Sequence, residues 1–419
     1  MARGRRRKGT RRIALSPNAR FRLLFVVPFA LVAGLLCFSV SGANILRPVR
    51  PDLAMSFQPF DARARARAAE QRLSTLPISR AQLAEAERLA LEALRRDPTI
   101  VVAWRTLGIV ATARNEEARA TRLFRFSGYL SKRDLPTQMW LIEDRVRAND
   151  IEGALRHYDA ALRAKPDSAA ALLPILVAAT ANDGIVPPLA RLLNTNPPWR
   201  RPFLTALASN APDAENFARF VELVIRGAPI EERNIVATRM AALIEQRQYG
   251  PALHVYRLLA GGDGRAQLVR NGSFEQPNPY PPLDWLLNDQ PDFRAEQQAA
   301  VPGGAGGRLQ ISASNGAGGV AARQMLLLSP GNYEIRATAG AVEEVRPARL
   351  GWSVQCNNPQ GTVLLEQDLP QLSARIAPAA RFRVPPGGCE GQWLSLKLRG
   401  DFDPGGVAAW IDLLSIRPI

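Results

Sequence analysis

Few residues of this sequence could hold a transition metal or act as a general base. The chain of 419 residues has two histidines, His157 and His254, and three cysteines. It contains no H-E-x-x-H, G-x-S-x-G or P-loop motif, so the usual signatures of zinc proteases, serine hydrolases and nucleotide-binding enzymes are missing. A glycosidase needs two carboxylates flanking a cleft, and no Asp/Glu pair stands out here. We therefore expect that the protein is not an enzyme.

Lysine is also scarce, and the basic charge is unevenly distributed. The formal net charge is +16, yet residues 1–22 alone carry nine Lys or Arg and no Asp or Glu. More than half of the excess charge thus belongs to a short basic tail. The rest of the chain shows no dense basic patch interleaved with aromatics, so we expect no nucleic-acid partner. The excess of Arg and Ala over Lys is typical of a bacterial genome rich in G and C.

Charge is absent altogether from residues 23–46, a run of 24 mostly apolar residues. As a helix this segment is about 36 Å long, enough to cross a hydrocarbon core of roughly 30 Å. Arg47 and Arg50 are the only charges close behind it, whereas nine basic residues precede it. The positive-inside rule then places the tail in the cytoplasm. We expect a single-pass protein of the bacterial inner membrane with its bulk in the periplasm.

A cleaved signal peptide is the alternative interpretation of the same segment. Ser41-Gly42-Ala43 fits a small-x-small cleavage site. The apolar run is longer than the 7–15 residues usual in signal peptides, and the basic region before it is long. These two features favour an anchor that is not removed.

Composition changes twice after this anchor. Residues 47–60 contain three prolines and predict an extended linker. Residues 61–260 have apolar residues at helical spacing, whereas 266–419 are rich in Gly and Pro between short alternating segments. Gly261–Gly264 form the expected hinge. The fold class is therefore multidomain, with one transmembrane helix, an all-α domain and an all-β sandwich.

The helical part repeats every 34 residues. Ala86, Ala120 and Ala154 are 34 apart, and so are Ala90, Phe124 and Tyr158, and Pro98, Lys132 and Pro166. The middle unit also contains Trp104-x-x-Leu107-Gly108. This pattern resembles the tetratricopeptide repeat over roughly residues 67–168. The third unit departs from it, with Gln138 at the Trp position and Ile142 at the Gly position. The resemblance implies a scaffold that binds a protein partner.

The C-terminal segment opens with Asn271-Gly-Ser-Phe-Glu275, followed by Trp285. Pro330-Gly-Asn-Tyr333 lies mid-domain, and the last strand carries Asp412. These stretches resemble the galactose-binding-like jelly roll of carbohydrate-binding modules, over the whole domain. The resemblance implies glycan binding. It also implies a structural calcium near the first and last strands, where Glu275 and Asp412 match the acidic positions.

A sugar site needs an aromatic ring for stacking and polar groups for the hydroxyls. Alternation puts Trp352 on the face of Leu350 and Val354, so we expect it in the core, and we expect Trp285 and Trp410 in the core or at an edge. Trp393 lies on the polar face and is the expected platform. Its expected polar neighbours are Arg336, Arg383 and Lys397.

The cysteines agree with export. Cys37 lies in the apolar segment, and the other two, Cys356 and Cys389, both lie in the C-terminal domain. Two cysteines alone in an exported domain can pair in an oxidising compartment. The bridge would contribute about 3.7 kcal/mol in the chain-entropy estimate.

The favoured hypothesis is a membrane-anchored periplasmic scaffold accessory to the assembly or export of a cell-surface polysaccharide such as an exopolysaccharide. The helical repeats would bind a protein and the jelly roll a glycan. The alternative is a structural protein-interaction factor of the envelope that binds no sugar. A degraded hydrolase is a third, weaker hypothesis.

Overall fold

The computed structural model describes residues 17–75, 77–261, 267–298, 307–314, 316–342, 349–370, 375–399 and 406–419. Most of the predicted basic tail (1–16) and Gly262–Gly264 of the expected hinge lie outside these ranges. The chain divides into two compact units, Met1–Pro166 and Asp167–Ile419. The boundary lies inside the segment 61–260 that we expected to form one helical domain.

The first unit begins with α1 (Pro17–Leu46), an apolar helix whose residues Phe25–Leu46 are long and apolar enough to cross a membrane. Its side chains face outward, with Phe29 75% and Leu35 73% exposed. Such a row of exposed apolar side chains is unfavourable in water. By length and composition α1 fits a membrane span or signal anchor, although a signal sequence has the same properties.

The segment after α1 is partly helical, which corrects the expected extended linker. α2 (Pro51–Phe57) starts at Pro51, and proline is well tolerated in the first helical turn because its missing N–H would be unpaired there. α2 packs back against α1, with Phe57 beside Gly42. The Ser39 hydroxyl donates to the Phe57 carbonyl at 2.6 Å. This contact satisfies a carbonyl at the end of α2.

The helices that follow form antiparallel neighbours. They are α3 (Ala62–Arg72), α4 (Arg80–Arg96), α5 (Val101–Ala113), α6 (Glu117–Leu130), α7 (Leu135–Arg147) and α8 (Ile151–Ala164). α5 and α7 start 34 residues apart, at 101 and 135, and so do α6 and α8, at 117 and 151. Asn115 and Asn149, also 34 apart, both adopt positive φ in the short turns, a conformation asparagine tolerates better than most residues.

Small residues let these helices approach each other. A Cβ on Gly108 would lie 2.7 Å from the Phe124 ring, and that ring also stacks on Trp140 at 4.3 Å. Ala120 and Ala154 are buried, as the repeat predicts. The helical region is therefore present with a 34-residue spacing in its middle part.

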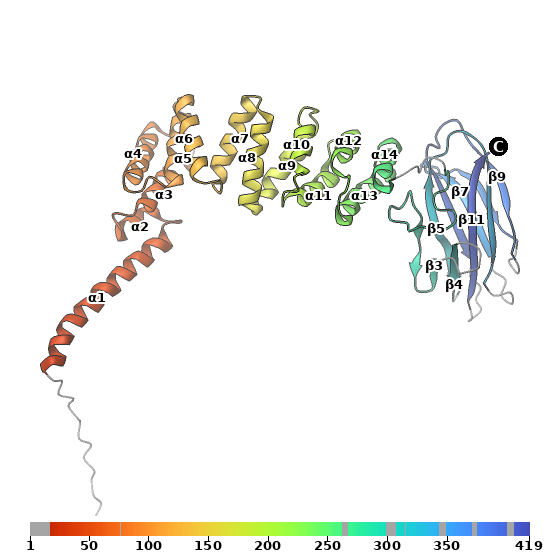
Figure 1. The fold of residues 1–419 in the computed structure, drawn as a ribbon, viewed down its shortest axis with the longest axis horizontal. Coiled ribbons are helices and arrows are strands. Elements are labelled where there is room, and N and C mark those ends of the chain that lie inside the picture. The colour runs from red at the N-terminus through yellow and green to blue at the C-terminus, as the bar shows by residue number, and fades with distance from the viewer. Residues whose placement is uncertain are drawn as a thin grey trace, which may run out of the picture. The chain divides into compact units, whose positions relative to one another are not determined.

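The second unit continues with helices but without that spacing. They are α9 (Ala169–Ala179), α10 (Val186–Leu193), α11 (Arg200–Asn210), α12 (Ala214–Val224), α13 (Ile230–Glu245) and α14 (Tyr249–Ala260). α9 packs on α11 and α11 on α13, while α10 packs on α12 and α12 on α14. Figure 1 shows these helices as a stack of antiparallel neighbours. Stacking of this kind builds a continuous core from units that could not bury their apolar faces alone.

The C-terminal part is a sandwich of two antiparallel sheets, as expected (Figure 1). The five-stranded sheet has the order β1 (Leu286–Leu287), β5 (Gly318–Leu326), β10 (Gln392–Arg399), β7 (Arg349–Cys356), β8 (Val363–Asp368). The six-stranded sheet has the order β2 (Asp289–Gln290), β3 (Phe293–Gln298), β4 (Arg308–Ala313), β11 (Val407–Pro418), β6 (Gly331–Ala341), β9 (Ala379–Val384).

The inner faces of both sheets form one core. Leu394, Leu396 and Leu398 of β10 are fully buried, and Trp352 lies opposite Leu396. Trp285 packs against Phe274 in the same core. Both tryptophans are 1% exposed. The alternation of apolar and polar residues thus predicts correctly which side of these strands faces inward.

α13 and α14 are joined to the sandwich by buried polar contacts. The Tyr256 hydroxyl donates to the Asp284 carboxylate at 2.7 Å, and the Arg233 guanidinium donates to the Tyr280 hydroxyl at 2.8 Å. The guanidinium of Arg270 lies over the Tyr256 ring. By these contacts the sandwich belongs to the same compact unit as α9–α14.

Candidate functional site

The four residues expected to bind a glycan lie on two different sheets. Trp393 and Lys397 are on β10 of the five-stranded sheet, while Arg336 is on β6 and Arg383 on β9 of the six-stranded sheet. A sandwich separates the outer faces of its sheets by the core, which is about 10 Å thick. The expected cluster of these four side chains therefore does not form, because two strands with polar outer faces can belong to opposite sides of the sandwich.

Trp393 is half-buried on the outer face of the five-stranded sheet. The Arg323 guanidinium lies over its ring, 4.5 Å from the centroid, in a cation–π contact. Lys397, on the same face of β10, pairs with Glu366 at 2.7 Å. The structure thus gives Trp393 a cation over its ring and gives Lys397 a carboxylate partner.

Trp410 lies neither in the core nor at an edge, which corrects the expectation for this residue. It is on β11, a central strand of the six-stranded sheet. Its neighbours Ala409 and Ile411 are fully buried in the core, whereas Trp410 is only half-buried. By alternation its side chain projects from the outer face of the sheet.

The indole of Trp410 lies flat on this outer face. A Cβ on the opposite residue, Gly340, would meet three indole atoms at 2.6–2.8 Å, so only glycine leaves room for the ring. The indole N–H donates to the Ala341 carbonyl at 3.1 Å and holds the ring in place. The Arg308 guanidinium carbon lies 5.8 Å from the ring centroid. A flat aromatic ring held on an open sheet is the geometry that stacks against a sugar ring.

Polar side chains border the Trp410 ring on one side. Gln310 is its cross-strand partner on β4. Gln310 accepts a hydrogen bond from Gln298, whose carbonyl oxygen accepts from Arg308 at 2.9 Å. Glu296 lies opposite Gln310 and is exposed. This network supplies donors and acceptors in fixed positions, which is what recognition of sugar hydroxyls requires. We name Trp410, Gly340, Gln310, Gln298 and Arg308 the Trp410 platform.

An arginine cluster lies on the same outer face, towards the other end of β6. Glu334 is only 6% exposed and pairs with Arg336 and Arg417, both at 2.6 Å, and with Arg381 at 3.7 Å. These hydrogen bonds and charges lower the pKa of Glu334 to about 2. Arg383, on β9, lies opposite Asn332 and is exposed. The expected Arg336 and Arg383 therefore share a face with Trp410 rather than with Trp393.

Glu275 and Asp412, the expected calcium ligands, come close to each other. Asp412 is buried and accepts from the Leu413 N–H at 2.5 Å. Burial raises the pKa of Asp412, and the Glu275 carboxylate raises it further. Two neighbouring carboxylates fit a cation in part, since calcium takes 6–8 oxygen ligands. Within the described ranges no group of three or more Asp, Glu, His or Cys could hold a metal.

Cys356 and Cys389 form a disulfide with a Cα–Cα distance of 5.0 Å, as expected. Cys356 ends β7, and Gln392 at the start of β10 lies directly opposite it. The bridge therefore closes the long connection between two adjacent strands.

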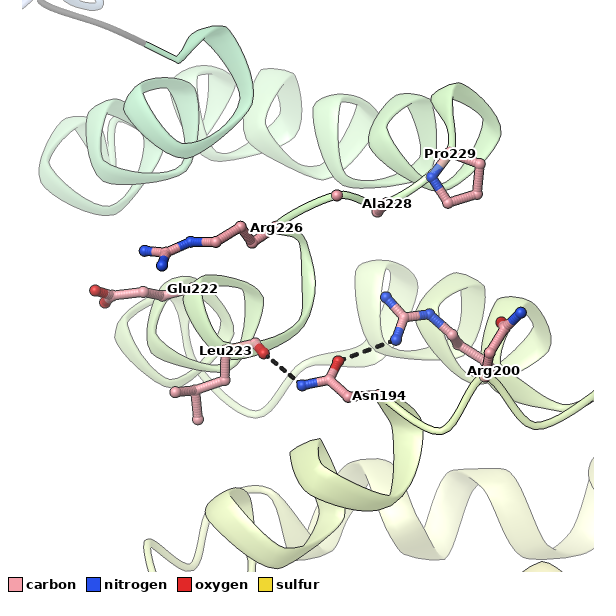
Figure 2. A pocket seen from close by; sticks show the side chains of 9 residues that line it. Asn194, Arg200, Glu222, Leu223, Arg226, Ala228 and Pro229 are labelled. Carbon is pink, nitrogen blue, oxygen red and sulfur yellow. Dashed lines mark hydrogen bonds between the residues drawn. The ribbon is translucent and has the colours of Figure 1, made fainter.

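A groove lies in the helical stack of the second unit (Figure 2). It has a volume of about 700 Å³ and is lined by Asn194, Asn196, Arg200, Glu222, Leu223, Arg226, Gly227, Ala228 and Pro229. At its base, buried Arg200 donates to the Val224 carbonyl at 2.6 Å and pairs with Glu232 at 3.0 Å. Figure 2 shows Asn194 between Arg200 and Leu223, bonded to both. Arg200 thus joins α11, the end of α12 and the start of α13.

The rim of this groove carries both charges and an apolar side chain. Glu222 and Arg226 are exposed, and Leu223 between them is 45% exposed. Glu222 also pairs with His254 at 3.2 Å.

Comparison with known proteins finds likeness in solved structures alone. No protein-family model matches the chain, and no curated protein matches it. A structure described as "CBM4 structure and function" covers 36% of this chain and 99% of its own, at 15% identity and a TM-score of 0.28. The match to the CBM22-1 xylan-binding domain from Paenibacillus barcinonensis Xyn10C covers 35% of this chain and 92% of that domain. Its sequence identity is 15% and its TM-score 0.27. The match to TmCBM61 in complex with beta-1,4-galactotriose covers 36% of this chain and 99% of TmCBM61. Its sequence identity is 12% and its TM-score 0.28.

Proposed function

We propose that this chain is a membrane-anchored protein of the bacterial envelope that binds a glycan on the outer face of the six-stranded sheet. The observation that carries the proposal is the Trp410 indole, which lies flat on Gly340 and is held by its bond to Ala341. The hydrogen-bonded chain of Arg308, Gln298 and Gln310 beside it supplies directional polar groups. Stacking and fixed polar groups together form the usual basis of sugar recognition.

The test is a glycan panel with the full-length protein in lipid nanodiscs. Titration is followed by calorimetry and by tryptophan fluorescence. Trp410→Ala should weaken the binding of any responding glycan at least tenfold, because stacking is lost, and Trp410→Phe should restore most of it. Trp393→Ala is the matched control on the opposite sheet and should bind like the wild type. If Trp393→Ala lost glycan affinity and Trp410→Ala did not, the site would lie on the five-stranded sheet instead.

The helices of the second unit would hold a protein partner in the groove lined by the segment after α10, the start of α11 and the end of α12 with the turn that follows it. The support is the mixed rim of Glu222, Leu223 and Arg226 over a base that Arg200 makes rigid. A photo-crosslinking residue at position 223 should capture one defined envelope protein in living cells. The same residue at Ser209, which is exposed on α11, should not. Crosslinks with no glycan response at all would favour the alternative, a protein-interaction factor without sugar binding.

The anchor is proposed to remain attached. Ala43 is 1% exposed and packs with Ala54 and Ala64, while Arg47 pairs with Asp61 at 2.7 Å. Loss of residues 1–43 would remove Ala43 and the Ser39 contact and would expose the small residues of α2 and α3. Mass spectrometry of the protein purified from membranes should therefore find residues 1–43 present. A mature N-terminus at Asn44 would contradict retention.

The proposed place of action is the periplasmic side of the inner membrane, with a role in assembling or exporting a surface polysaccharide and no catalytic activity. The basic tail before α1 supports this orientation. Cysteine labelling at exposed Ser209 from outside the cytoplasmic membrane tests it. Release of reducing sugar from any bound polysaccharide by the purified protein would contradict the absence of catalysis.

A further inference from the structure

We propose that the glycan bound by this protein is anionic, and that the arginine cluster of the six-stranded sheet recognises its charged groups. This inference rests on the proposed function and names the class of ligand for the same face. Its basis is the charge of this cluster, where Arg336, Arg381 and Arg417 share Glu334 and the exposed Arg383 lies two positions from Arg381 on β9.

The cluster has more cationic groups than its own carboxylate can satisfy. Glu334 is shared by Arg336, Arg381 and Arg417, whose side chains remain 50%, 75% and 57% exposed. Among the described residues Arg383 has no ion-pair partner. Each guanidinium offers five N–H donors, so most of these donors face solvent. The group of five residues has a net charge of about +3 at neutral pH.

Glu334 organises the cluster rather than neutralising it. Because its pKa is lowered to about 2, it stays ionised at every physiological pH. It is buried beneath the arginines and holds Arg336 and Arg417 by bonds of 2.6 Å. Fixing the guanidinium groups in advance reduces the conformational entropy that a ligand must overcome. A planar guanidinium also matches a carboxylate, sulfate or phosphate better than an ammonium does.

The cluster and the Trp410 platform can contact one ligand. Gly340 and Arg336 are both on β6, four residues apart, so their outward positions are separated by roughly 13 Å along the strand. Thr338 lies between them on the same face, opposite Asp412. An extended chain of a few sugars covers such a distance. One neutral ring would stack on Trp410 while the acidic group of a neighbouring sugar meets Arg336 or Arg383.

The five-stranded sheet does not offer the same surplus. Lys397 pairs with Glu366 at 2.7 Å, Arg399 lies 3.8 Å from Asp368, and Arg323 covers the Trp393 ring. Lys397, Arg399 and Arg323 therefore have acidic or aromatic partners, and Arg349 on β7 is a single exposed cation beside them. This difference supports the six-stranded sheet as the anion-binding face.

The experiment compares matched acidic and neutral polymers on the full-length protein in nanodiscs. One pair is polygalacturonate and its carboxyl-reduced form, and a second is dextran sulfate and dextran. The wild type should bind at least one acidic polymer tenfold or more tightly than its neutral counterpart. The preference should shrink between 50 and 500 mM salt, roughly the range over which exposed charges become screened. The pair that responds distinguishes carboxylate from sulfate.

The double variant Arg381→Gln/Arg383→Gln should lose most of this preference, because it removes two exposed cations of β9 without breaking the 2.6 Å bonds of Glu334. The control Arg349→Gln/Arg399→Gln removes the same charge from neighbouring positions of the five-stranded sheet and should bind like the wild type. Equal effects of both double variants would overturn the proposal, since binding would then depend on net charge alone.

The remaining outcomes separate this inference from the proposed function. Equal binding of acidic and neutral polymers, with loss in Trp410→Ala, overturns the anionic ligand and keeps the glycan site. No binding to any polymer removes both. The last outcome is that Arg381→Gln/Arg383→Gln reduces the binding of detergent-free protein to phosphatidylglycerol vesicles but not to any polymer. The cluster would then bind lipid headgroups, and its assignment to a glycan would be wrong.

Discussion

At the scale of single residues, the absence of one side chain decides whether an aromatic ring can serve as a platform. Trp410 lies flat because Gly340 has no Cβ, and the nearest indole atom would otherwise be 2.6 Å away. A side chain at position 340 would tilt the ring away from the sheet. With alanine at this position the ring could not lie against the backbone of β6.

Gly340→Ala is therefore expected to weaken glycan binding as strongly as Trp410→Ala. It should also destabilise the fold by about 1–3 kcal/mol, the usual cost of inserting an atom into a filled space. Urea denaturation measures the stability and calorimetry the affinity. Gly250→Ala is the control, since nothing lies within 4 Å of a Cβ there. Unchanged glycan affinity in Gly340→Ala would show that the flat ring is not required.

His157 is expected to make the stability of the first unit depend on pH. Its imidazole bonds to the Gln138 carbonyl oxygen at 2.9 Å, and burial, with Lys132 nearby, lowers its pKa to about 4. The unfolded chain binds the proton near pH 6.5. Stability should thus fall as the pH drops from about 6.5 to 4, by at most about 3 kcal/mol. His157→Gln should flatten this part of the urea-midpoint profile. Parallel profiles for the two proteins would exclude His157 as the cause.

At the scale of elements, the disulfide acts on two neighbouring strands that are far apart in sequence. Cys356 and Cys389 are separated by 33 residues, so the bridge removes much of the freedom of the unfolded connection. Replacing both by alanine should lower the free energy of unfolding by about 3.7 kcal/mol. Urea titration followed by tryptophan fluorescence measures this loss. Cys37→Ala, at an exposed position of α1, should change nothing. If the double variant also kept the free energy of unfolding of the wild type, the bridge would have no stabilising role.

Calcium would bind where the first and last segments of the sandwich meet. The backbone of Leu414 donates to Gly272 at 2.9 Å, next to the carboxylates of Glu275 and Asp412. Calcium there would relieve their repulsion, so millimolar Ca²⁺ should raise the melting temperature by a few degrees. Asp412→Asn should abolish the shift, and Asp289→Asn, at an exposed carboxylate of β2, should keep it. A wild-type protein indifferent to Ca²⁺ would exclude the site.

At the scale of the whole molecule, the second unit joins helices and sandwich through the Tyr256–Asp284 bond. Asp284 is 6% exposed and also accepts from the Tyr280 N–H at 2.9 Å. Helices α9–α14 and the sandwich are therefore expected to unfold in one transition. Tyr256→Phe should destabilise this unit by about 1–3 kcal/mol, because a buried carboxylate oxygen loses its donor. Scanning calorimetry measures the transition, with Tyr129→Phe, at an 80% exposed tyrosine, as control. Two separate wild-type transitions for helices and sandwich would contradict the coupling.

Patterns within a short stretch of sequence were sufficient to predict most of the helices and strands. The apolar run of α1, the helical spacing of α3–α8 and the alternation that buries Trp352 and Leu396 depend on neighbours within a few residues. The linker expected at 47–60 is wrong for a related reason. Three prolines suggest extension, but a proline in a first turn also starts a helix, and contact with α1 stabilised that helix.

The sequence by itself determined the membrane-type helix, the helical and β parts, and the cysteine pair, because each is specified by local periodicity, composition or residue count. Only the tertiary structure decided which sheet carries Trp410, which arginines share its face and where the compact units divide. Those facts depend on strand order and on pairs such as Gly340–Trp410 and Tyr256–Asp284. Strands adjacent in a sheet can be far apart in the chain, so alternation tells inside from outside but cannot tell one outer face from the other.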